Sequence, residues 1–134
     1  MNKQGYGVYQ EAQAQELDQA KLILMMYTGA ITFLNKALEV SKTNKIEMGK
    51  YMSLSKNFIL ELMASLDVEK GGEMGDILLR NYRMLFSKLN AAHMRDDIEK
   101  IAEVRDSLEE LKETWIQVFS SREYQEFKKK QAAS

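Results

Sequence analysis

The sequence lacks several residue types that carry chemistry: its 134 residues include no cysteine, no proline and one histidine. Without cysteine there is no disulfide, no thiol catalysis and no cysteine zinc site, which suits a cytosolic protein. Without proline, no residue forces a helix to stop. The one histidine, His93, follows Asn90 by three positions, so the Glu-x-x-His motif of di-iron bundles is absent. We therefore predict a protein that is not an enzyme, with no catalytic residue, cofactor or metal.

The sequence also has no large excess of positive or negative charge and no long apolar run. The formal net charge is −1, so no overall field favours nucleic acid or an anionic membrane. The longest apolar runs are far shorter than the roughly 20 residues that a membrane span needs. Residues 1–15 lack the apolar region of a secretory signal. We predict a cytoplasmic protein that neither binds nucleic acid nor inserts into a membrane.

Apolar residues recur every three or four positions along most of the chain, which is typical of amphipathic helices. No segment shows the pattern of a strand. Four helices of about 20 residues with short connections predict an all-α fold, an antiparallel up-and-down four-helix bundle. The predicted domains are a mobile N-terminal arm at residues 1–17, the bundle at residues 18–120 and a polar C-terminal tail at residues 121–134.

Capping residues and glycines mark the expected helix boundaries. Asp and Asn are good N-caps because their side chains accept hydrogen bonds from free backbone N–H groups, and a Glu three residues later completes a capping box. Glycine supplies the left-handed backbone of a helix exit. These signals are Asp18 for the first helix, Asn44 with Glu47 for the second, Gly71 and Gly72 before the third, and Asp96 with Glu99 for the fourth.

The stretch Leu22–Val40 is too apolar for a helix with one buried face. On a helical wheel its apolar residues form two neighbouring stripes that span roughly 200°, whereas one core contact needs about 100°. We assign the first stripe to the bundle core. The second stripe is covered by the N-terminal arm, by a neighbouring helix or by a partner, and consists of Ile23, Tyr27, Ile31 and Leu34.

The second and third helices also carry wide apolar arcs, and the chain contains nine methionines, a residue over-used on deformable binding surfaces. Wide apolar surfaces mark docking sites for amphipathic segments, although burial in the bundle centre accounts for much of this width. The other predicted partner-binding residues are Leu60, Met63, Leu79, Tyr82 and Phe86, and the predicted N-terminal cap over the surface is Tyr6 and Tyr9. Asn81 falls within the apolar arc, so it either hydrogen-bonds across the bundle or meets a partner's backbone.

Several short motifs, taken in order, resemble the flagellin export chaperone family, commonly called FliS. The resemblance covers about residues 18–115. It is carried by Leu22–Ala30, similar to the family's "LYDGA" segment, by Glu61–Asp67, similar to "ELxxSLD", by the Gly71–Glu73 turn, by Ala91–Asp97, and by Glu113–Trp115 with the single tryptophan. The chain departs from the family pattern at Gln19, Asn81 and His93, where proline, leucine and asparagine are usual.

The resemblance implies a cytoplasmic bundle that binds the disordered C-terminal segment of flagellin along apolar helix surfaces. Such binding would prevent premature polymerisation and deliver flagellin to the flagellar type III export apparatus, and export-gate or other flagellar regulatory proteins are further implied partners. A segment that orders on binding needs a large apolar surface to offset its lost entropy. The alternative is a self-associating structural or scaffold bundle, whose wide faces are buried between copies.

Overall fold

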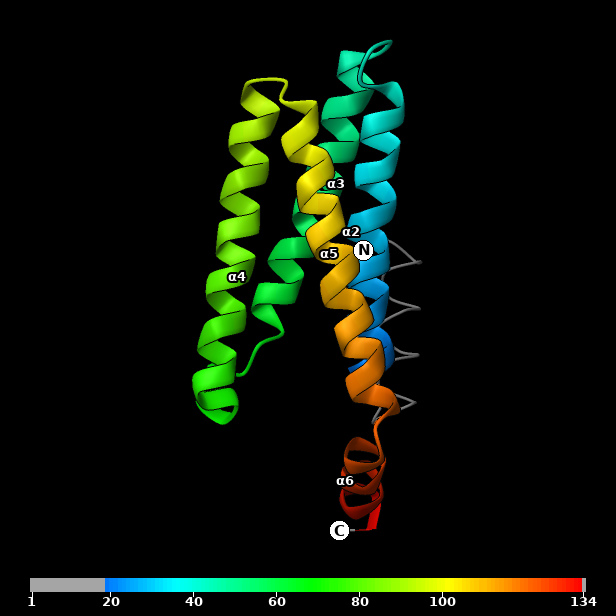
Figure 1. Cartoon of the computed structure of the whole chain (residues 1–134), viewed down its shortest axis with the longest axis vertical. Coiled ribbons are helices and arrows are strands. Elements are labelled where there is room, and N and C mark those ends of the chain that lie inside the picture. Colours follow the sequence, from blue (N-terminus) through cyan, green and yellow to red (C-terminus); the bar gives the residue numbers. More distant parts are fainter. Residues whose placement is uncertain (1–18, 134) are drawn as a thin grey trace, which may run out of the picture.

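The computed structural model describes residues 19–133, apart from the side chains of residues 68–70. This part of the chain is all-helical and contains no strand. Its helices are α2 (Gln19–Val40), α3 (Lys45–Ala64), α4 (Val68–Met94), α5 (Ile98–Ser120) and α6 (Arg122–Ala133). Helices α2 to α5 form the predicted antiparallel bundle (Figure 1). The arm expected at residues 1–17 lies outside the described residues.

Polar side chains cap the N-termini of α3 and α5, and the cap predicted for α3 is confirmed. The Asn44 side chain accepts a hydrogen bond from the backbone N–H of Glu47 at 3.0 Å, which satisfies a free donor in the first turn of α3. The predicted cap of α5 is wrong by one residue, because Asp97 accepts the hydrogen bond from Lys100 N–H at 3.2 Å. Asp96 instead has φ 53°, the left-handed conformation that ends α4.

The connection into α4 depends on Gly72. Its φ of 54° and ψ of −133° form a backbone conformation that side-chain-bearing residues rarely adopt. Gly72 separates a first turn, residues 68–71, from the continuous part of α4, which begins at Glu73. The expected glycine turn is therefore confirmed at Gly72.

The bundle helices form a ring in which α2 packs between α3 and α5, and α4 packs against the same two helices from the other side. Figure 1 shows α5 in front, α3 behind and α2 and α4 at the two flanks. Their inward-facing residues make one core. Its largest fully buried members are Tyr27, Tyr82, Leu34, Met48, Met52, Ile59, Leu62, Leu89, Ile101 and Leu108.

Small residues let α2 and α3 pack closely. The fully buried Ser55 hydroxyl of α3 donates a hydrogen bond to the Ala30 carbonyl oxygen of α2 at 2.8 Å. One residue earlier, the ring of Phe58 occupies the space beside Gly29. A Cβ at Gly29 would lie 2.6 Å from two carbons of that ring, so only glycine fits the observed packing.

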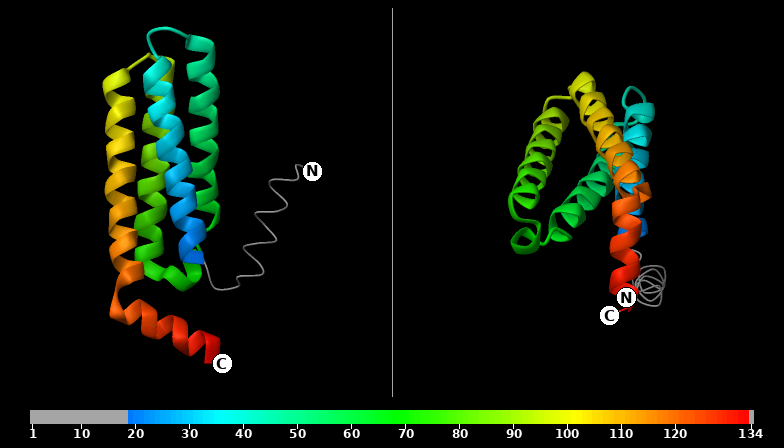
Figure 2. Two further views of the ribbon diagram at one scale, coloured as in Figure 1. Left: turned by 90° about the vertical axis from the view of Figure 1, so that its right-hand side faces the viewer. Right: turned by 60° about the horizontal axis from the view of Figure 1, so that its bottom comes forward.

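The apolar seam of α5 is covered along its first half only. Val104 and Leu108 are fully buried, whereas Trp115 is partly exposed and Val118 is 43% exposed. Helices α4 and α5 meet at the turn of residues 95–97 and separate towards their other ends (Figure 1; Figure 2, right). The second half of the seam is open because α4 has moved away from it.

The segment predicted as a polar tail contains a further helix, α6. Ser121 is extended, with φ −69° and ψ 153°, and interrupts the helical path. Its hydroxyl oxygen accepts a hydrogen bond from the Tyr124 N–H at 3.2 Å and so caps α6. The Gln125 side chain donates to the Phe119 carbonyl oxygen across the bend at 2.7 Å. Helix α6 therefore runs obliquely beyond the end of the bundle in a fixed orientation (Figure 2, left).

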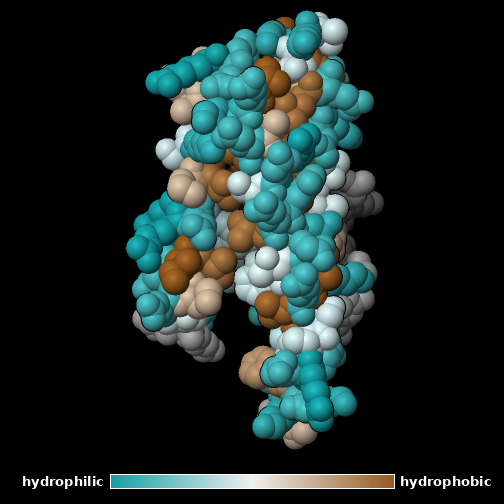
Figure 3. All heavy atoms as spheres, viewed as in Figure 1, coloured by the Kyte–Doolittle hydropathy of each residue, from teal (hydrophilic) through white to brown (hydrophobic). Residues whose placement is uncertain are grey.

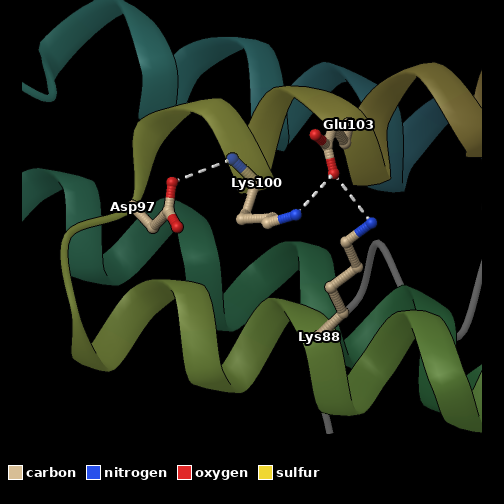
Figure 4. A network of polar contacts seen from close by, with 4 residues as sticks. All are labelled: Lys88, Asp97, Lys100 and Glu103. Atoms are coloured by element: carbon tan, nitrogen blue, oxygen red, sulfur yellow. Dashed lines mark hydrogen bonds and ion pairs between the residues drawn. The ribbon is translucent and has the colours of Figure 1, made fainter.

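A surface ion pair between Lys88 and Glu103 joins α4 to α5 close to their shared turn, and Lys100 of α5 shares the same carboxylate. A carboxylate oxygen of Glu103 lies 2.8 Å from the Lys88 ammonium and 3.4 Å from that of Lys100 (Figure 4). Hydrogen bonds from these two lysines hold the pKa of the Glu103 carboxyl below its ordinary value. Because the carboxylate is exposed, water and salt screen the attraction, and the pairs contribute little to stability.

Candidate functional site

Four of the predicted partner-binding residues lie in the bundle core rather than on an open face. Tyr27 and Leu34 are 0% exposed, Tyr82 is 1% exposed and Ile31 is 9% exposed. These positions face neighbouring helices rather than an open surface, because α2 packs between α3 and α5, and α4, which carries Tyr82, packs against the same two helices. A neighbouring helix, rather than a partner, covers this part of α2.

Three of the bundle helices are joined by a buried hydrogen-bonded network of Tyr27, Tyr82 and Trp115. The Tyr27 hydroxyl oxygen accepts from the indole N–H of Trp115 at 3.1 Å and lies 2.5 Å from the Tyr82 hydroxyl. Burial raises the pKa of both phenols above the ordinary value, because a phenolate would lose its hydration. The network stays neutral and serves to position α2, α4 and α5.

The other five predicted residues reach the surface to different degrees. Leu60 on α3 is 45% exposed, and Leu79 on α4 is partly exposed. Ile23, Met63 and Phe86 each present one side to the core and keep another accessible. Of the residues predicted within the described chain, these five are the ones that a partner can touch.

Further exposed apolar side chains, which were not among the predicted partner-binding residues, enlarge the accessible surface. They are Met25, Ile46, Leu54, Met74, Ile77, Met84, Met94, Val118 and Phe127. The start of α4 is open because it has separated from α5, and Figure 3 shows apolar groups exposed on that part of α4. Four of the nine are methionines, so the methionine count was the signal in the sequence that pointed to this surface.

A groove of about 650 Å³ lies where α2 begins and α5 ends, with α6 as its third wall. Its apolar lining includes Met25, Phe119 and Tyr124, and its charged lining residues are Lys21 and Lys128. The rings of Phe119 and Tyr124 are 5.0 Å apart, which fixes α6 against the end of α5. The described part of the chain begins beside this groove, whose lining includes Ala20 and Lys21.

One pair of titratable side chains, Lys56 and His93, lies between α3 and α4. The His93 imidazole nitrogen Nδ1 lies 3.2 Å from the Lys56 ammonium. Burial, together with the charge of Lys56, lowers the pKa of His93, so its neutral ring accepts this hydrogen bond. Among residues 19–133 no cluster of three or more metal-ligating side chains occurs, and no helix in that range is both long and apolar enough to cross a membrane.

The bundle and its accessible apolar surfaces define a helical protein suited to binding other chains. A family model described as "Flagellar protein FliS" matches residues 1–122. The chain therefore belongs to the FliS family, which confirms the resemblance in its sequence. The matched residues contain the whole bundle and end at the first residue of α6.

Two relatives show the extent of the similarity. One from Campylobacter jejuni is 30% identical over 121 residues, covering 90% of this chain and 94% of the relative. Another from Salmonella typhimurium is 33% identical over 108 residues, covering 79% and 80%. Both are named flagellar secretion chaperone FliS, which is a class of chaperones and not of enzymes.

Proposed function

We propose that this chain is a cytoplasmic flagellar secretion chaperone that binds the C-terminal segment of flagellin. Binding keeps flagellin from polymerising prematurely and delivers it to the flagellar type III export apparatus. The match to the FliS family over residues 1–122 carries the proposal. The exposed apolar side chains support it, since a segment that orders on binding needs such a surface to offset its lost entropy.

The binding surface that we propose lies on α3 and α4, with a contribution from the start of α2. Leu60 and Met63 occupy the last turns of α3, and Leu79 and Phe86 lie on its packed neighbour α4. Ile23 adds an accessible position on α2. The core residues of the same helices hold this surface in shape and do not contact flagellin themselves.

The N-terminal arm is the proposed cap of the empty chaperone. Tyr6 and Tyr9 would cover the groove between α2, α5 and α6, which lies where residues 1–18 join the chain. Two aromatic side chains suit its apolar lining. A bound flagellin segment that continues past Ile23 into this groove would displace the arm, and export-gate or other flagellar regulatory proteins would then meet the loaded chaperone. Replacing both tyrosines with serine should therefore strengthen flagellin binding, and unchanged or weaker binding would contradict the cap.

Calorimetry with the full chain and a flagellin C-terminal peptide tests the main proposal. We expect Leu60→Asp to weaken binding at least about tenfold, because a carboxylate would replace an apolar contact. Ile46→Asp is the matched control, since Ile46 is a 78% exposed apolar residue at the other end of the same helix. A wild-type chain that shows no binding at tens of micromolar peptide, a concentration far above nanomolar affinities, would refute the proposal.

Self-association is the competing function that the exposed apolar surface allows. A scaffold bundle would bury the surface around Leu60 against a second copy. Light scattering over a dilution series separates the two functions. A monomer that binds flagellin supports the chaperone function. A stable dimer that does not bind flagellin, and that becomes monomeric when Leu60→Asp is introduced, would establish the scaffold function.

A further inference from the structure

A second, smaller groove lies between α4 and α5, at the level where the two helices begin to separate. Its volume is about 270 Å³. This lies just below the roughly 300–1,000 Å³ of small-molecule sites, so the space suits one long side chain. The polar residues that line it are Asn81, Ser107, Glu110 and Thr114, and its apolar lining includes Met84 and Leu111.

Three of the four polar side chains have no partner among the described residues. The Asn81 amide, the Ser107 hydroxyl and the Glu110 carboxylate form no hydrogen bond or ion pair within that part of the chain. The Thr114 hydroxyl donates to the Glu110 backbone carbonyl at 3.0 Å, which leaves its oxygen free to accept. Of the two alternatives for Asn81, a bond across the bundle is therefore not the one observed.

The polar lining is rich in acceptors and carries one negative charge. The four side chains all present acceptor oxygens, and Glu110 is the charged residue of the lining. An arginine side chain matches this set, because its planar guanidinium has five donors and no acceptor and pairs with carboxylates in two places at once. Its aliphatic stem suits the apolar wall, where Met84 is 59% exposed.

We propose that the groove between α4 and α5 binds a single arginine side chain of the exported substrate. The guanidinium pairs with Glu110 and donates a further hydrogen bond to the Asn81 side-chain oxygen, while the stem packs on Met84 and Leu111. The source of the arginine rests on the proposed chaperone function, whereas the chemistry of the groove does not. A basic residue fits because the groove supplies the opposite charge.

Nuclear magnetic resonance with a small probe tests the groove without flagellin. N-acetyl-arginine-N-methylamide, added at millimolar concentration to the labelled full chain, should shift the Asn81 side-chain amide signals in a saturable way, since one side chain gives weak binding. Glu110→Gln should abolish the shift, whereas Glu113→Gln, an exposed acid outside the lining, should preserve it. No shift in the wild type, or an undiminished shift in Glu110→Gln, would overturn the proposal. Equal binding of the lysine analogue would overturn the choice of arginine.

Replacing each arginine of the flagellin C-terminal peptide with alanine provides the second test. One replacement should weaken binding to the wild-type chain about tenfold and have no effect on Glu110→Gln, as a double-mutant cycle of a direct contact requires. A peptide that binds the wild type but shows no such coupling overturns the arginine site and leaves the chaperone proposal intact. A peptide that does not bind at all overturns the chaperone proposal, and the small probe then decides on the groove.

Discussion

Removing one oxygen atom from the core should show how far the buried network stabilises the bundle. In Tyr27→Phe the ring and its packing are kept, but the hydroxyl that contacts both Tyr82 and Trp115 is lost. Tyr82 is 1% exposed, so its hydroxyl loses its bond to Tyr27 at a position that water does not reach, at a cost of about 1–3 kcal/mol. The partly exposed Trp115 finds water more easily and adds about 0.5–1.5 kcal/mol. We expect the free energy of unfolding to fall by about 2–4 kcal/mol.

Urea denaturation followed by fluorescence measures this change, because Trp115 is the only tryptophan and lies in the network. Tyr82→Phe is the matched comparison and should cost less, since the bond from Trp115 to Tyr27 survives. The double variant should cost less than the sum of the two, because each replacement removes the same bond. A Tyr27→Phe variant within about 0.5 kcal/mol of the wild type, or a Tyr82→Phe variant that costs more, would refute the reasoning.

Four further predictions concern pH and packing. Burial raises the pKa of Tyr27 above its ordinary 10.0. The free energy of unfolding should therefore hold below about pH 10 and fall above it, because the phenol then ionises in the unfolded chain but not in the folded one. Urea titrations at alkaline pH should show a shallower fall in Tyr27→Phe than in the wild type. The pKa of His93 is lowered in the folded chain, so protonation favours the unfolded chain. The free energy of unfolding should therefore drop as the pH falls below about 6.5, and His93→Gln should remove this loss in the same titrations. Gly29→Ala should destabilise by about 1–2 kcal/mol, since overpacking against the Phe58 ring exceeds the gain in helix propensity. Gly49→Ala meets only an ordinary contact at 3.8 Å, so thermal melting should show it stabilised by about 0.5–1 kcal/mol.

Local signals in the sequence were sufficient to predict most of the fold. Apolar spacing and polar caps locate the four bundle helices, and Asn44 caps α3 as expected. The error at Asp96 has a local cause, because two aspartates stand side by side and either suits an N-cap. Which one caps α5 depends on the left-handed backbone at Asp96, and composition does not reveal that conformation.

The candidate site was harder to predict, because exposure depends on neighbours that a helical wheel does not contain. The wheel measures the width of the apolar face of α2 but does not show that two neighbouring helices share it. Tyr27 and Leu34, which those helices bury, therefore remain among the partner-binding candidates that the wheel selects. Helix α6 escaped prediction for a different reason. Few apolar residues mark it, and its orientation is set by the Ser121 cap and by contacts with Phe119.

The spacing of apolar residues along α5 indicates that the open end of the bundle is meant to be covered. Its apolar residues continue at the same spacing past Leu108 through Trp115 to Val118, although the helix that covers them has already turned away. If the second half of α5 faced water permanently, polar residues would be expected at these positions, because exposed apolar surface lowers solubility without adding stability. The sequence thus specifies a longer seam than the described helices bury. Under the proposed function, a substrate segment that extends from the start of α2 over the neighbouring end of α5 supplies the missing cover, so hydrogen exchange in the second half of α5 should slow when flagellin is bound.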